Sequence, residues 1–130
     1  LAHAVGEETL VTSPGQVRAT LMYTAPEILL RKGPSPASDL YSLGLIGLEM
    51  LTGSVPFSHR TLAGIASAQL GEQPPSVSSR RPGLSRWWDR VLEKLLAKEP
   101  AMRYRSASDL SKDLEALATQ LSLMGDPAAS

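Results

Sequence analysis

The stretch LYSLGLIGLEML, residues 40–51, decides how this sequence folds. Its apolar residues lie on every side of a helical axis instead of forming one stripe, so we expect a helix that is buried on all sides. At twelve residues it is shorter than the roughly 20 that a membrane-spanning helix needs. Gly44 and Gly47 each weaken a helix by about 1 kcal/mol relative to alanine, which is tolerable if another backbone approaches closely there.

Shorter helical patterns flank this central stretch. The apolar spacing predicts helices at residues 25–31, 60–70, 84–99 and 106–121, and sequence signals of β-strands are nearly absent after the first dozen residues. Residues 1–20 show no sustained period and are rich in Gly, Pro, Ser and Thr, which is typical of an irregular segment. We therefore predict a mainly α fold of about five helices around a central buried helix, with an irregular N-terminal segment.

The composition excludes several classes of protein. The chain has no cysteine, so a disulfide scaffold and a thiolate zinc site are both ruled out. Basic and acidic residues balance at 13 each, which gives no reason to expect nucleic acid or an anionic membrane as a partner. We expect a cytoplasmic location, and a membrane anchor elsewhere in a longer parent protein stays open.

Three stretches, taken together and in order, resemble part of a known family. ATLMYTAPEIL, SDLYSLGLIGLEMLTGSVPF and LLAKEPAMRYRSASDL are similar to the C-terminal half of a protein kinase catalytic domain of the bacterial serine/threonine type. The resemblance implies a partial kinase domain at residues 1–118, with an activation segment at 1–27 and a helical platform at 28–118. Residues 119–130 would then form the end of the last helix and a frayed tail.

The resemblance assigns substrate docking to residues 20–27, TLMYTAPE, which we call the docking segment. In the family, the threonine matching Thr20 reaches the catalytic aspartate and is typical of serine/threonine kinases. Ala19 stands where the family usually has glycine, and a left-handed or tight backbone at that position would resist alanine. We therefore expect some distortion of the docking segment at this point.

Structural roles also follow from the resemblance. Glu27 ends the Ala-Pro-Glu signature, and Arg103 resembles the arginine that pairs with it. Pro26 favours a helix start, and a guanidinium can hold a carboxylate through two parallel hydrogen bonds. Asp39 resembles the aspartate that holds the catalytic loop through hydrogen bonds to the backbone of that loop. An acidic residue is also favoured at any helix N-terminus, where it needs no further role.

Three residues before the docking segment are candidate phosphorylation sites. Thr9, Thr12 and Ser13 lie where the family has its activation loop, and a phosphate there would order the loop against a cation, for which Arg18 is a local candidate. The alternative is that all three are ordinary loop residues. The sequence does not decide between these interpretations.

The groups that perform phosphoryl transfer are missing from the sequence. It contains no Gly-rich phosphate loop, no strand lysine in a V-A-I-K context, no His-Arg-Asp and no Asp-Phe-Gly. We expect a fragment that is inactive alone and binds no cofactor or metal, whereas ATP and Mg²⁺ would bind the complete parent kinase. Its partners would be the missing N-terminal lobe and catalytic loop, together with protein substrates. A pseudokinase-like interaction module without catalysis and an unrelated helical domain are the alternatives.

Overall fold

The computed structural model describes residues 13–59 and 61–124. This part of the chain is helical and contains no strand, which confirms the mainly α prediction. Its elements are α1 (Pro14–Met22), α2 (Pro26–Leu29), α3 (Pro36–Thr52), α4 (Leu62–Gly71), α5 (Val77–Arg80), α6 (Trp87–Leu95), the 3-10 helix η2 (Pro100–Met102) and α7 (Ala107–Met124). None of the described helices combines the length and the apolar character needed to cross a membrane.

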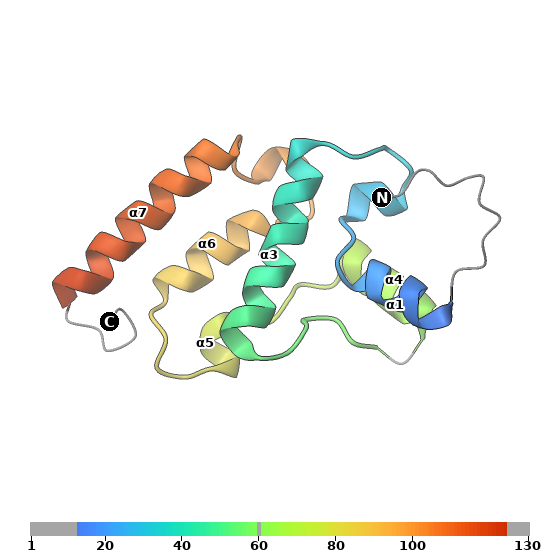
Figure 1. Cartoon of the computed structure of the whole chain (residues 1–130), viewed down its shortest axis with the longest axis horizontal. Helices are drawn as coiled ribbons and strands as arrows, with labels where there is room; N and C mark the ends of the chain where they lie inside the picture. The colour runs from blue at the N-terminus through green and yellow to red at the C-terminus, as the bar shows by residue number, and fades with distance from the viewer. Residues whose placement is uncertain (1–12, 60, 125–130) are drawn as a thin grey trace.

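Helix α3 occupies the centre of the molecule, with α6 and α7 on one side and α1, α2 and α4 on the other (Figure 1). It starts at a capping box, in which the Ser35 hydroxyl accepts a hydrogen bond from the Ser38 amide and the Ser38 hydroxyl accepts one from the Ser35 amide. It ends at Gly53, whose φ of 86° is a left-handed conformation that glycine adopts without strain. The main core gathers around it and includes Tyr41, Leu45, Leu48, Phe57, Leu95 and Leu117.

One face of α3 is exposed, so the prediction of a helix buried on all sides is wrong for this chain. Leu43, Ile46 and Met50 are 46%, 43% and 78% exposed. Beside them, α3, α6 and α7 enclose an almost entirely apolar groove of about 240 Å³, lined by Leu43, Met50, Trp88, Leu95, Leu110 and Leu114 among others. The sequence shows that every side of the helix is apolar, but it does not show which side has a covering segment within the chain.

The prediction that residues 1–20 are largely irregular is wrong from residue 14 onward. Ser13 caps α1 by accepting a hydrogen bond from the Gln16 amide, and the Gln16 side chain accepts one from the Ser13 amide. Pro14 occupies the first helical turn, where its missing N–H is tolerated. Ala19 lies inside this helix with an ordinary negative φ, so the described backbone carries no left-handed strain at that position.

The Pro-rich region at residues 72–83 also contains a helix that its polar sequence does not indicate. Ser76 caps α5, and the Asp89 carboxylate from α6 accepts hydrogen bonds from the Val77 and Ser78 amides at 2.7 and 3.2 Å. Asp89 therefore acts as a cap supplied from a distant part of the chain. Together with α1, this short helix explains why the described region has more helices than the five expected.

Candidate functional site

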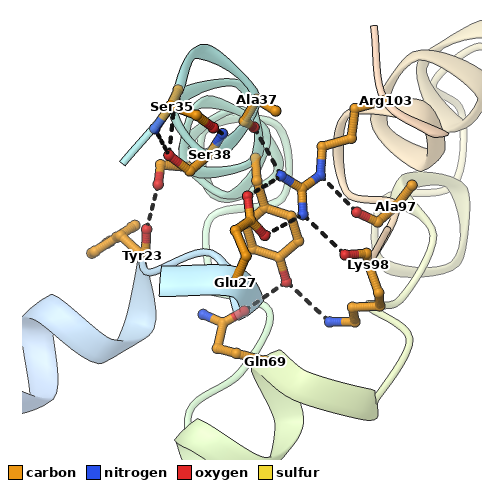
Figure 2. A network of polar contacts seen from close by, with 11 residues as sticks. Tyr23, Glu27, Ser35, Ala37, Ser38, Gln69, Ala97, Lys98 and Arg103 are labelled. Atoms are coloured by element: carbon orange, nitrogen blue, oxygen red, sulfur yellow. Dashed lines mark hydrogen bonds and ion pairs between the residues drawn. The ribbon is translucent and has the colours of Figure 1, made fainter. Parts of the chain in front are cut away.

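Glu27 and Arg103 form the centre of the site, although 76 residues separate them in the sequence. Arg103 Nη1 donates to Glu27 Oε2 at 2.6 Å, and Arg103 Nη2 donates to Glu27 Oε1 at 2.8 Å. Figure 2 shows the guanidinium facing the carboxylate in this two-bond arrangement. The contact that the sequence predicts between these two residues is therefore present.

The rest of the guanidinium is satisfied by backbone carbonyls. Its remaining donors reach the carbonyl oxygens of Ala97, Lys98 and Ala37 at 2.8, 3.1 and 2.9 Å. The ring of Tyr41 lies 4.8 Å from the guanidinium carbon, within range of a cation–π contact. Arg103 thus joins α2, the start of α3 and the segment that follows α6.

Burial makes this pair energetically important. Glu27 is 7% exposed and Arg103 is 3% exposed, so neither charge is well solvated. Burial alone would raise the pKa of the Glu27 carboxyl, but the hydrogen bonds from Arg103 and from the backbone lower it below its usual value. Glu27 is therefore an anion at neutral pH, and removing Arg103 would leave an unpaired buried charge.

The local sequence places Glu27 in the first turn of α2. Ala25 is extended and precedes Pro26, which occupies the first helical position. A carboxylate in the first turn of a helix is favoured by the backbone amides there. The Pro-Glu order therefore begins the short helix and directs the carboxylate toward Arg103.

Tyr23 fastens the docking segment to α3 at two further points that sequence reasoning did not identify. Its hydroxyl donates to Glu49 Oε1 at 2.5 Å, and its carbonyl accepts from the Ser42 hydroxyl at 2.6 Å. The hydrogen bond to Glu49 and burial raise the pKa of the Tyr23 phenol. Ser42 and Glu49 lie seven residues apart in a largely apolar helix, and that spacing was the available signal that they share a face.

Thr20 and Ser13, the other predicted residues nearby, use their hydroxyls locally. Thr20 Oγ1 donates to the Gln16 carbonyl at 2.9 Å within α1, and Ser13 is the cap of that helix. Thr9 and Thr12 lie outside the described residues. Arg18 donates to the carbonyls of Ser58 and His59 at 3.3 and 2.6 Å, which ties α1 to the chain between α3 and α4.

Asp39 lies in the first turn of α3 and is exposed. Within residues 13–59 and 61–124 its carboxylate has no hydrogen-bond or ion-pair partner, so the structure does not bring it together with Thr20, Glu27 or Arg103. No group of three or more His, Asp or Glu side chains in the same described ranges could hold a metal ion.

Lys98 is an additional buried cation next to the pair. Its Nζ donates to the Tyr41 hydroxyl at 3.0 Å and to the Ala68 carbonyl at 3.2 Å, and it lies 4.8 Å from the centre of the Phe57 ring. Burial lowers the pKa of Lys98 to about 8, with Glu72 opposing that shift and Arg103 adding to it. Sequence reasoning did not single out this lysine.

Lys98 should make stability depend on pH. Its pKa is about 8 in the folded chain and about 10.4 when unfolded, so the unfolded chain binds more protons between those values. We therefore expect the urea midpoint to gain a positive contribution as pH rises from 7 to 9.5, before tyrosine ionisation opposes it. Lys98→Met should remove this contribution, whereas the exposed control Lys112→Met should retain it. An identical pH profile for Lys98→Met and the unaltered chain would contradict this assignment.

The fold and the anchored Ala-Pro-Glu segment define the class of protein. The profile of the protein kinase domain family matches residues 2–114, which is most of the chain. The chain belongs to the protein kinase family.

Curated relatives from mycobacteria are similar to this chain. The serine/threonine-protein kinase PknJ of Mycobacterium tuberculosis is 42% identical over 113 residues, which cover 85% of this chain and 19% of PknJ. PknB of Mycobacterium leprae is 36% identical over 114 residues, covering 88% of this chain and 18% of PknB. The chain spans about a fifth of the length of these two relatives, and it resembles their bacterial serine/threonine type.

Proposed function

We propose that this chain supplies the substrate-docking segment and the helical platform of a serine/threonine protein kinase, which transfers the γ-phosphate of ATP to serine or threonine in proteins. The observation that carries this proposal is the buried two-bond pair between Glu27 and Arg103. It fixes the end of residues 20–27 to the helical bundle, and a segment that orients a substrate must itself be held in place.

The chain's own residues would position groups and would not perform the transfer. Nucleotide binding in the family relies on the Gly-rich loop, the strand lysine and the metal-binding aspartate, and the sequence contains none of these motifs. When both are bound at such a site, ATP supplies the phosphoryl group and Mg²⁺ neutralises the charge on the phosphates. The residues present do not form that site alone.

Two exposed residues would meet the missing catalytic loop. Thr20 lies near the C-terminal end of α1 and would reach the catalytic aspartate, while Asp39 would accept hydrogen bonds from the catalytic-loop backbone. The Asp39 carboxylate has no polar partner among residues 13–59 and 61–124, and an apolar groove lies beside Leu43 and Met50. Both observations support an upstream segment that covers this side of α3. A phosphate on Ser13 would lie at the N-terminus of α1, where the helix dipole favours negative charge.

The isolated chain should be inert. Purified residues 1–130 are expected neither to bind ATP with Mg²⁺ in calorimetric titration nor to transfer label from radioactive ATP to a protein, because the nucleotide-binding motifs are absent. The exposed apolar face of α3 should also make the chain poorly soluble. Transfer that persists after removal of contaminating kinases and disappears in Thr20→Ala would show that the chemistry lies within this chain.

A chimera tests the proposed function directly. The part of PknJ that precedes its stretch similar to this chain would be joined to residues 1–130, and transfer to a serine/threonine substrate protein would be measured. We expect transfer by the chimera and a large loss in Asp39→Ala and Thr20→Ala, with ATP affinity retained. Ser111→Ala, an exposed position on α7, is the matched control. A folded chimera that binds ATP and transfers nothing would favour the pseudokinase-like interaction module.

A further inference from the structure

Gln69 is a fully buried polar residue beside the Glu27–Arg103 pair. It lies on α4 with 0% exposure, and both ends of its amide are bonded. Its Oε1 accepts from the Tyr41 hydroxyl at 2.7 Å, and its Nε2 donates to the Leu21 carbonyl at 3.0 Å. Figure 2 shows Gln69 and Lys98 beside the Glu27–Arg103 pair.

The hydrogen bonds in this cluster run in one direction. A protonated Lys98 can only donate, so the Tyr41 oxygen accepts from Lys98 and its single proton goes to Gln69. The Gln69 carbonyl is thereby committed to Tyr41, and its NH₂ group must face Leu21. Lys98 also donates to the Ala68 carbonyl, on the residue before Gln69, so the same cation fixes α4 next to this amide.

We propose that Gln69 is a positioning residue for the docking segment, and that Lys98 and Tyr41 fix the orientation in which it works. Leu21 directly follows Thr20 in the chain, so holding the Leu21 carbonyl limits where Thr20 can lie. The proposal rests on the proposed function only for its consequence in catalysis. The hydrogen bonds themselves are independent of it.

No other tether in the described part of the docking segment duplicates this one. The contacts of Tyr23 and Glu27 hold later residues, and they connect to α3 and to Arg103. The Leu21 carbonyl also accepts a long bond of 3.3 Å from the Thr24 amide, which lies within the same segment and does not connect it to another helix. Gln69 therefore supplies a side-chain hydrogen bond from α4 to the residue next to Thr20, in addition to the packing of α1 on α4. A buried donor that lost this acceptor would be left unsatisfied.

Hydrogen–deuterium exchange on the 130-residue chain tests the proposal without any need for activity. Gln69→Met keeps the length of the side chain and removes both hydrogen bonds, while Gln69→Glu keeps an acceptor for Tyr41 and removes the donor to Leu21. In both variants we expect the amides of residues 21–24 to exchange about fivefold faster, the factor expected for one hydrogen bond. Exchange in the core of α3 should be unchanged.

Tyrosine variants provide the matched control and protect the test against a variant that fails to fold. Tyr41→Phe removes the hydroxyl that orients Gln69 and should also accelerate exchange at 21–24. Tyr104→Phe removes the hydroxyl of another buried tyrosine, which donates to Asp113 on α7 at 2.7 Å, and should not accelerate exchange at 21–24. If neither Tyr41→Phe nor Gln69→Met accelerates exchange at 21–24 beyond the Tyr104→Phe variant, the proposal is overturned.

Kinetics of the chimera separate positioning from general stability. Gln69→Met should raise the KM for the protein substrate about fivefold and leave the KM for ATP unchanged, because only the docking segment is displaced. An equal rise in the KM for the protein substrate and the KM for ATP would mean that Gln69 contributes only to general stability, and would overturn the positioning role. If the Gln69 variants accelerate hydrogen–deuterium exchange only at residues 21–24 but the chimera is inactive, the Gln69–Leu21 connection stands and the proposed kinase function is rejected.

Discussion

Arg103→Met is expected to lower the free energy of unfolding by about 3–5 kcal/mol, because it leaves the Glu27 carboxylate buried and unpaired. Three backbone carbonyls would also lose their donor, at Ala97, Lys98 and Ala37. Urea denaturation followed by circular dichroism measures the change. The control Arg105→Met removes an exposed arginine two residues away and should stay within about 0.5 kcal/mol of the unaltered chain.

The double variant Glu27→Gln/Arg103→Met separates two contributions to the loss of stability, the unpaired charge of Glu27 and the lost packing of Arg103. Glu27→Gln removes the buried charge, so the double variant should be more stable than Arg103→Met alone. A double variant that is less stable than Arg103→Met would mean that the unpaired carboxylate is not the source of the loss.

Acid should weaken the same pair. The pKa of Glu27 is lowered in the folded chain, so its stabilising contribution is present above the unfolded value near 4.3 and is lost as pH falls through the folded pKa. Glu27→Gln cannot titrate at this position. Its stability difference from the unaltered chain should therefore shrink below about pH 4.

Gly44→Ala is expected to destabilise the chain, whereas Gly47→Ala is not. A Cβ at residue 44 would lie 2.8 Å from Leu96 Cδ2 and 2.9 Å from Leu95 Cβ, which is too close without movement of α6. We expect a loss of about 1–3 kcal/mol from this overpacking.

Residue 47 is the matched control on the same helix. A Cβ there would meet only Leu92 Cδ2 at 3.6 Å, an ordinary contact, and alanine is the better helix former by about 1 kcal/mol. Gly47→Ala should therefore be neutral or stabilising in urea denaturation. Equal effects of the two substitutions would contradict the close packing of α3 on α6 at Gly44.

The central helix and the Glu27–Arg103 ion pair could both be predicted from the sequence. The helix has a local signal in its apolar composition, and the pair follows from the order of the family's motifs. The run at 40–51 specifies a core helix by composition, and its true start at Pro36 follows from the Ser35 capping box. The Glu27–Arg103 pair was predictable from the resemblance, since both residues stand in recognisable motifs. The close backbone expected at Gly44 and Gly47 is wrong, because the atoms nearest a Cβ at Gly44 belong to the Leu95 and Leu96 side chains and a Cβ at Gly47 would meet the Leu92 side chain at 3.6 Å.

The remaining features depend on contacts that no local pattern encodes. Helix α1 was not predicted because the periodic spacing of apolar residues is weak there. Ser13, Pro14 and Gln16 nevertheless form the sequence pattern of a helix N-terminus. The Asp89 cap of α5 lies 12 residues from Val77, and the Gln69 bond to Leu21 spans 48 residues. Such pairs become visible only once the helices are placed beside one another.

Phosphoamino-acid analysis of protein labelled by the chimera of the PknJ upstream portion and residues 1–130 decides whether this chain can serve as the docking platform of a serine/threonine kinase. We expect labelled phosphoserine or phosphothreonine, and much less label when Asp39→Ala or Thr20→Ala is present. A folded chimera that binds ATP with Mg²⁺ but yields no label, or yields phosphotyrosine alone, would contradict the claim that this chain is the docking platform of a serine/threonine kinase.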